Sequence, residues 1–228
     1  MDWLEKIDAY CERTDASYWS EPLNAATNAA FILAALILWR QTGGLRRGQI
    51  LCVILFAIGI GSYLFHTHAT AWASTADTAP IGLFILTYLF LVNRDVLRLP
   101  LWAAAAVTLG FIPYTLVLVP VLDQIPFLMI SDFYWTVPLL LFAYAIWLWR
   151  SQPETARGLA IGAGLLCLSI AIRSLDIGFC ARWPMGTHFI WHLLNATMLG
   201  WMIHVYCRHV LAGHVLAGHV LAGSDQGR

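Results

Sequence analysis

Hydrophobic residues occur along this chain in long runs that are separated by short polar stretches. Seven runs approach the roughly 20 residues that a helix needs to cross about 30 Å of hydrocarbon. They cover residues 23–40, 48–66, 77–94, 100–121, 132–150, 157–177 and 187–207. Because the runs are continuous rather than alternating, they favour helices over the strands of a closed barrel. We therefore predict an all-α, polytopic membrane protein: a seven-transmembrane helix bundle.

Composition supports a membrane protein and indicates how the chain is divided. Of 228 residues, 60% are hydrophobic and 11% are charged, whereas a soluble domain has about 25% charged residues. We expect an acidic N-terminal segment (1–22), a transmembrane domain (23–208) and a low-complexity tail (209–228). The tail contains three copies of His-Val-Leu-Ala-Gly, and we expect it to be frayed or disordered. Zero net charge and the lack of a long basic stretch argue against a nucleic-acid partner.

The distribution of arginine predicts the orientation of the bundle. Arginines lie in the connections after the first, third and fifth runs, whereas those after the second and fourth contain no Lys or Arg. The positive-inside rule then places the N-terminus outside and the C-terminus in the cytoplasm. Lys6, Arg13 and Arg182 are exceptions, although acids dominate around the first two. In this topology the end of the second run and the starts of the third and seventh share the non-cytoplasmic end.

Three histidines lie at this end. His66 ends the second run, while His188 and His192 are four residues apart at the start of the seventh and so share a helical face. Three neutral imidazoles with one open position form the ligand set of a catalytic zinc. A single histidine at a helix end is more often just hydrogen-bonded, but three at one depth favour a metal. His68 is a weaker candidate than His66 for the same ligand position. A two-residue step turns a helix by about 200°, so the two side chains point in nearly opposite directions.

Polar residues near these histidines predict chemistry. Ser62 lies one helical turn before His66, and Asp77 begins the third run. Ionisable residues inside a membrane are costly and indicate function, and a carboxylate can handle the proton of a zinc-activated water. A serine that only packs helices is the alternative for Ser62. Arg173 and Asp176, three residues apart in the sixth run, are expected at the same end and able to pair.

The N-terminal segment contains a cluster of acids and a cysteine. The six acids are Asp2, Glu5, Asp8, Glu12, Asp15 and Glu21. Oxygen-rich, histidine-free clusters suit hard cations such as calcium, and the alternative is a solvated acidic face. Cys11 and Cys180 would both lie outside, where oxidising conditions allow a disulfide. Two free thiols are the alternative for this pair.

Several motifs together resemble the alkaline ceramidase family, and in particular a bacterial member. They are Tyr10–Arg13, Glu21–Asn28, Gly61–Thr67, Asp77 and Gly186–Asn195. The resemblance extends over nearly the whole chain to about Arg208, and the repeat tail lies outside it. The wider superfamily includes the adiponectin-receptor-like proteins, which share seven helices and a three-histidine zinc site.

The resemblance implies roles for individual residues. It implies zinc bound by His66, His188 and His192 with a water as fourth ligand, Asp77 interacting with that water, and Ser62 close by. It also implies a calcium site made by N-terminal acids. Glu12 and Glu21 match this site best, and Asp8 and Asp15 are weaker candidates. Thr14 stands where the family has an asparagine, which weakens the calcium prediction. A family disulfide would match Cys11 and Cys180.

The function implied is zinc-dependent hydrolysis of the amide bond of ceramide-like N-acyl lipids within the membrane. Its products would be a fatty acid and a long-chain amine. In a bacterium the protein would lie in the inner membrane, with the active site towards the non-cytoplasmic face. No protein partner is implied. The alternatives are a receptor-like member of the superfamily with a structural zinc, or an amidase for another N-acyl lipid.

Overall fold

The computed structural model describes residues 2–225, with side chains as far as residue 213. It is helical, and within that part of the chain there is no strand, only an isolated bridge between Lys6 and Thr70. The helices are α1 (Pro22–Thr27), α2 (Ala29–Gln41), α3 (Arg46–His68), α4 (Ala71–Leu91), the π-helical turn η1 (Val92–Val96), α5 (Leu101–Leu109), α6 (Phe111–Leu122), α7 (Pro126–Met129), α8 (Asp132–Leu148), α9 (Pro153–Ser174), α10 (Asp176–Phe179) and α11 (His188–Asp225).

Five helical segments are long and apolar enough to cross a membrane. They are Pro22–Gln41, Arg46–His68, Ala71–Val96, Leu101–Leu122 and Pro153–Ser174. The helix α8 is apolar but shorter, with 17 residues, and α11 has 38 residues. The all-α class is therefore confirmed, and these five segments are consistent with a membrane protein. The number of spans and their orientation stay predictions.

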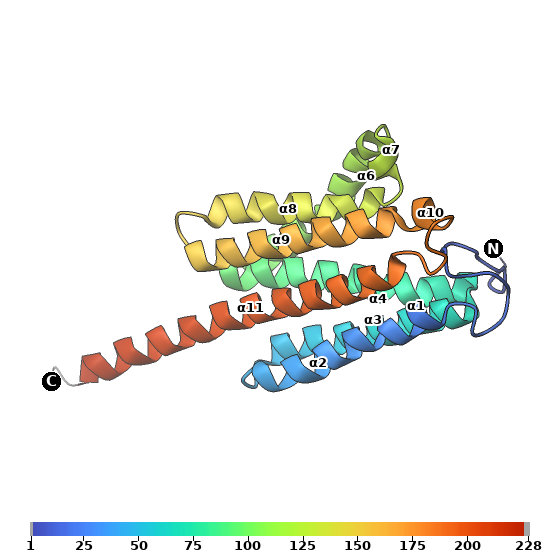
Figure 1. The fold of residues 1–228 in the computed structure, drawn as a ribbon. Helices are drawn as coiled ribbons and strands as arrows, with labels where there is room; N and C mark the ends of the chain where they lie inside the picture. The colour runs from blue at the N-terminus through green and yellow to red at the C-terminus, as the bar shows by residue number, and fades with distance from the viewer. Residues whose placement is uncertain (1, 226–228) are drawn as a thin grey trace.

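Two element boundaries differ from the expected ones. The third run was expected to start at Asp77, but α4 starts at Ala71; α3 ends at His68, because the next residue, Ala69, has a left-handed φ of 46°. Asp77 is therefore inside a helix rather than at its first residue. The helix α11 continues to Asp225, through repeats that were expected to be frayed. Alanine and leucine in those repeats favour helix, and α11 runs past the other helices in Figure 1.

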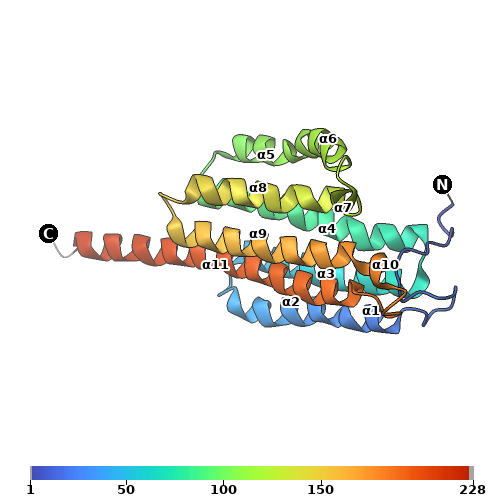
Figure 2. The same cartoon turned by 45° about the horizontal axis from the view of Figure 1, so that its top comes forward.

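The helices pack lengthwise, and small residues allow close approach at two contacts. The helix α3 packs along α2 and α4, and α9 packs along α8 and α11 (Figure 2). At Gly61 of α3, an added Cβ would lie 2.0 Å from the carbonyl oxygen of Ala76 in α4. At Gly158 of α9, an added Cβ would lie 2.6 Å from Cγ2 of Val205 in α11. Such contacts are typical of helix packing in membranes, where close van der Waals contact replaces the hydrophobic effect.

The N-terminal segment lies across the end of the bundle where α3 ends and α11 begins (Figure 1). The backbone N–H of Ile7 donates to the carbonyl of Ala69 at 2.9 Å. Cys11 forms a disulfide with Cys180, just after α10. These two attachments hold residues 2–21 over the ends of helices that are far apart in the sequence, and so position the site below.

Candidate metal centre

The three histidines converge at the end of the bundle that the N-terminal segment covers. His66 comes from the last turn of α3, and His188 and His192 come from the first two turns of α11. One ring nitrogen from each lies within 4.8 Å of the others, and all three side chains are buried. Among the described residues this is the one group of three or more His, Cys, Asp or Glu with the geometry to hold a metal ion.

The hydrogen bonds of two histidines leave their Nε2 atoms free to bind a metal. Thr27 donates its hydroxyl hydrogen to the carbonyl of Leu23, so its oxygen accepts from Nδ1 of His192 at 2.9 Å. Glu21 accepts from Nδ1 of His66 at 2.5 Å. With Nδ1 protonated in both rings, each Nε2 carries a lone pair. Both Nε2 atoms are buried and have no hydrogen-bond partner in the described part of the chain.

Buried ring nitrogens without hydrogen-bond partners are suited to binding a metal ion. Leaving a polar group in this state costs about 1–3 kcal/mol, and here the two Nε2 atoms belong to one cluster. Histidines that bind metals usually donate their second nitrogen to a carboxylate, carbonyl or similar acceptor. Glu21 and Thr27 have that role in this structure. The residues present therefore fit a zinc ion bound by nitrogen ligands.

Tyr10, from the N-terminal segment, covers this cluster with its ring. Its ring stacks on that of His188, with centroids 3.7 Å apart, and lies 5.1 Å from that of His66. Burial raises the pKa of the Tyr10 hydroxyl, and the nearby positive charge of Arg173 opposes this only in part. Tyr10 therefore stays a neutral aromatic cover. Tyr10 was not among the predicted site residues, although it lies in a motif that carries the family resemblance.

Ser62 and Asp77 lie beside the histidines where α3 and α4 approach most closely. An added Cβ on Gly61 would lie 3.2 Å from Cα of Asp77, so no side chain separates the two helices there. The Ser62 hydroxyl lies beside the Asp77 carboxyl, and His66 and Arg173 are also close to that carboxyl. Ser62 is buried and Asp77 is half-buried. The structure thus gathers the predicted acid, the serine and the three histidines in one place.

Arg173 and Asp176 do not pair, which corrects the expectation from their spacing. The helix α9 ends at Ser174 and α10 begins at Asp176, so the two side chains are not on one continuous helix. Arg173 donates to the Ser131 hydroxyl at 2.7 Å. Its guanidinium also lies 5.2 Å from the ring centroid of Tyr134, within the range of a cation–π interaction.

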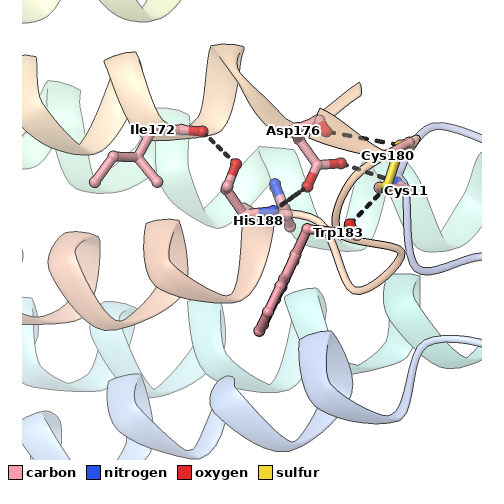
Figure 3. Close-up of a disulfide and its surroundings, with 7 residues drawn as sticks. Cys11, Ile172, Asp176, Cys180, Trp183 and His188 are labelled. Carbon is pink, nitrogen blue, oxygen red and sulfur yellow. Dashed lines mark hydrogen bonds between the residues drawn. A yellow bond between two sulfur atoms is a disulfide. The ribbon is translucent and has the colours of Figure 1, made fainter. Parts of the chain in front are cut away.

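Asp176 instead ties three segments together. Its carboxylate accepts from the backbone N–H groups of Cys11 at 2.9 Å, Thr187 at 2.6 Å and His188 at 2.9 Å. Figure 3 shows the contacts of Asp176 with Cys11 and His188 beside the Cys11–Cys180 disulfide. A carboxylate at the start of a helix satisfies N–H groups that have no partner within the helix. Asp176 therefore fixes the start of α11, and with it the position of His188.

The N-terminal acids do not converge on a cation. Both carboxylate oxygens of Glu12 accept backbone N–H groups, from Leu23 at 2.7 Å and Asn24 at 2.8 Å, at the start of α1. Asp8 and Asp15 are exposed. The hydrogen bond from Ser17 at 2.7 Å lowers the pKa of Asp15. These carboxylates are either used by the protein's own donors or directed to solvent, so they do not fit a calcium ion.

Arg13 supplies the positive charge next to Glu21. Its Nε donates to Glu21 at 2.5 Å, and its Nη2 donates to the carbonyl of His66 at 3.0 Å. Burial alone would raise the pKa of Glu21, but the hydrogen bonds from His66 and Asn24 and the charge of Arg13 hold it below its ordinary value. In the sequence, Arg13 stands out only as an exception to the positive-inside rule. A basic residue at the end predicted to be non-cytoplasmic, surrounded by acids, could have indicated that Arg13 forms a buried ion pair, here with Glu21.

The helical fold and this site define a class: a membrane-embedded protein with a buried three-histidine centre that can hold a metal ion. Comparison with known families narrows the class. The Ceramidase family model matches residues 6–216, so the chain belongs to the ceramidase family. No curated protein matches the chain. Family membership associates the site with hydrolysis of the ceramide amide bond.

Proposed function

We propose that this protein is a zinc-dependent amidohydrolase that cleaves the amide bond of ceramide or a similar N-acyl lipid to a fatty acid and a long-chain amine. The observation that carries the proposal is the buried cluster of His66, His188 and His192, two of whose Nε2 atoms lack partners, with Asp77 beside it. Membership of the ceramidase family supports the amide as the bond that is cleaved.

A zinc ion held by the three histidines would acidify a water molecule and polarise the amide carbonyl. Asp77 would accept a proton from the attacking water and later transfer it to the leaving nitrogen as the carbon–nitrogen bond breaks. The Ser62 hydroxyl, beside Asp77, would donate a hydrogen bond to the carbonyl oxygen as its negative charge develops. Tyr10 and the N-terminal segment would limit the access of bulk water from above.

An apolar pocket inside the bundle supports a lipid substrate. It lies between α4, α8, α9 and α11 and is lined by residues that include Phe84, Tyr88, Leu141, Trp191 and Met198. Trp191 precedes the ligand His192 directly in the sequence. The pocket has a volume of about 50 Å³, so an acyl chain would have to displace its lining side chains in order to enter. We propose this pocket as the acyl-chain site.

We propose seven membrane spans with the metal centre at the non-cytoplasmic face, in the inner membrane if the host is a bacterium. The five long apolar segments, the shorter α8 and the long α11 support the number of spans, and the arginine distribution supports the orientation. In this arrangement residues 1–22 cover the centre from outside and residues 23–208 form the bundle. The repeat tail from 209 would be cytoplasmic; its side chains beyond residue 213 lie outside the described residues.

The decisive experiment combines metal analysis with a lipid-release assay on the purified protein. We expect one zinc per chain, release of fatty acid from ceramide, and loss of release after zinc is removed. Asp77→Asn should reduce turnover by at least about 100-fold with zinc still bound, and Thr78→Ala, at an exposed position next to it, is the matched control.

Other outcomes would distinguish the alternatives. Bound zinc without release from any N-acyl lipid would contradict the enzyme and support a receptor-like protein, whereas release only from another N-acyl lipid would replace ceramide as substrate. Calcium is measured in the same samples, because the family resemblance predicts it at Glu12, Glu21, Asp8 and Asp15. The contacts of these acids lead us to expect less than one calcium per chain.

A further inference from the structure

A second cavity lies at the other end of the bundle, and the proposed reaction does not use it. Its volume is about 880 Å³, and it lies where η1, α8, α9 and α11 come together. The basic residues that line it are Arg98, Arg157, Arg208, His204 and His209. Glu154 is the one acid among its lining residues. The cavity is therefore strongly biased towards positive charge.

The arginine charges at this cavity are not used within the protein. Arg98, Arg157 and Arg208 are exposed, and none forms an ion pair or side-chain hydrogen bond among the described residues. By contrast, Arg47 at the same end pairs with Asp95. Guanidinium groups keep their charge at any physiological pH and match the geometry of phosphate oxygens. Three such groups around one cavity indicate an anionic ligand.

The position of the cavity indicates that this ligand is a lipid. The helix α9 has 22 residues; it starts at Pro153, which lines the cavity, and ends at Ser174 near the metal centre. At 1.5 Å per residue this separation is about 33 Å, which matches the thickness of the hydrocarbon layer. Trp147 and Trp201 also line the cavity, and tryptophan is enriched at the membrane–water boundary.

The lining changes from charged to apolar, as an amphipathic ligand requires. Ile161 and Val205 line the cavity together with the arginines. On the adjacent surface of α8, the side chains of Ile146 and Trp147 are 77% and 74% exposed, so an acyl chain could lie along them. A small soluble anion has no apolar part that could contact these side chains, whereas a lipid has.

We propose that this cavity binds the head group of an anionic phospholipid of the leaflet opposite the metal centre. The three arginines bind the phosphate, and the acyl chains lie along the exposed face of α8. Basic pockets between transmembrane helices bind anionic head groups in this way. The site is separate from the proposed active site, and the proposal does not depend on the proposed enzymatic activity.

The backbone at Arg98 supports a functional role for its side chain. Its φ is 57°, in the left-handed region that favours glycine. The residue follows η1, where the N–H of Leu97 donates to the carbonyl of Val92 at 3.0 Å and ends the helix. Glycine would meet this conformational demand with less strain. Arg98→Gly therefore removes the charge without harming the fold, which makes it a useful variant.

The test measures lipid binding to the delipidated full chain by native mass spectrometry. Phosphatidylglycerol and phosphatidylcholine with identical acyl chains are compared, and inorganic phosphate is added as a competitor. The variant is Arg98→Gln/Arg157→Gln/Arg208→Gln. The matched control is Arg40→Gln/Arg46→Gln/Arg150→Gln, which removes the same charge from exposed positions outside the cavity.

We expect the unmodified protein to prefer phosphatidylglycerol by at least tenfold. Each cavity arginine should contribute about fivefold, so the triple variant loses the preference while the control changes it by less than twofold. Arg98→Gly should weaken binding about fivefold without lowering the melting temperature. The proposal is overturned if the unmodified protein shows no preference for phosphatidylglycerol, or if both triple variants lose the preference equally. It is also overturned if millimolar phosphate competes fully, or if Arg98→Gly lowers the melting temperature as well as lipid binding.

Discussion

At the residue scale, the metal centre depends on which nitrogen of each histidine carries the proton. Glu21 and the Thr27 hydroxyl both accept from Nδ1, so the Nε2 atoms of His66 and His192 face the cluster unprotonated. Such partners orient the ring and raise the basicity of the ligand. Thr27 makes the cleaner test, because a change at Glu21 also leaves the buried Arg13 without its partner.

We predict that Thr27→Val lowers zinc affinity by about 10–100-fold, as loss of such a partner typically does. Valine has nearly the same shape but cannot accept from Nδ1 of His192. Competition with a fluorescent zinc chelator measures the effect. Glu12→Gln is the control, because Glu12 caps the start of α1 without touching a histidine, and it should change zinc affinity by less than about threefold. Unchanged affinity in Thr27→Val would remove Thr27 from the centre.

At the scale of elements, the contact between α3 and α4 sets the distance from Asp77 to the histidines. Gly61 lies against the backbone of Ala76, the residue before Asp77, so the two helices approach more closely than any side chain would allow. Ser62 and His66, on α3, are thereby brought to the Asp77 carboxyl on α4. A change at this contact should therefore affect stability and turnover together.

Gly61→Ala should lower the free energy of unfolding by about 1–3 kcal/mol, as overpacking does, and should strongly reduce turnover. The added Cβ would lie 2.0 Å from the Ala76 oxygen, so α3 and α4 must separate. Thermal unfolding and the lipid-release assay measure the two effects. Gly82→Ala on α4, where an added Cβ meets nothing within 4 Å, should be neutral or stabilise by up to about 1 kcal/mol. Equal behaviour of the two variants would contradict this account.

At the scale of the whole molecule, the N-terminal segment is fastened over the metal centre to the loop that precedes α11. The Cys11–Cys180 disulfide joins positions 169 residues apart. Asp176 adds hydrogen bonds to Cys11 and to the start of α11. The N-terminal segment held in this way carries Tyr10, Arg13 and Glu21 to the histidines.

Cys11→Ser/Cys180→Ser should lower the free energy of unfolding by about 2–4 kcal/mol and should also weaken zinc binding, because Tyr10 and Glu21 lose their fixed positions. Thermal unfolding and chelator competition, each with and without a reducing agent, measure this. Cys167→Ser is the control, because Cys167 is a free, half-buried thiol and should change little. A double variant with full zinc affinity would show that the segment does not support the centre.

The sequence alone determined the class of the protein and the residue types of its centre. Apolar runs report spans because the length needed to cross hydrocarbon is a local property of a helix. Histidines and an acid within such runs are informative because they are costly there. These arguments found His66, His188, His192, Asp77 and Ser62, but they could not distinguish a calcium site from other uses of the N-terminal acids.

Only the tertiary structure decided which groups face one another. Glu21 reaches His66 across 45 residues, and Asp176 turns away from Arg173 because a helix ends between them. Both results depend on how the helices and the N-terminal segment pack, and no spacing rule contains that information. Helical spans follow from the chemistry of short segments, whereas the partners of a buried charge depend on long-range packing, which places Arg13 and Glu21 at the metal centre.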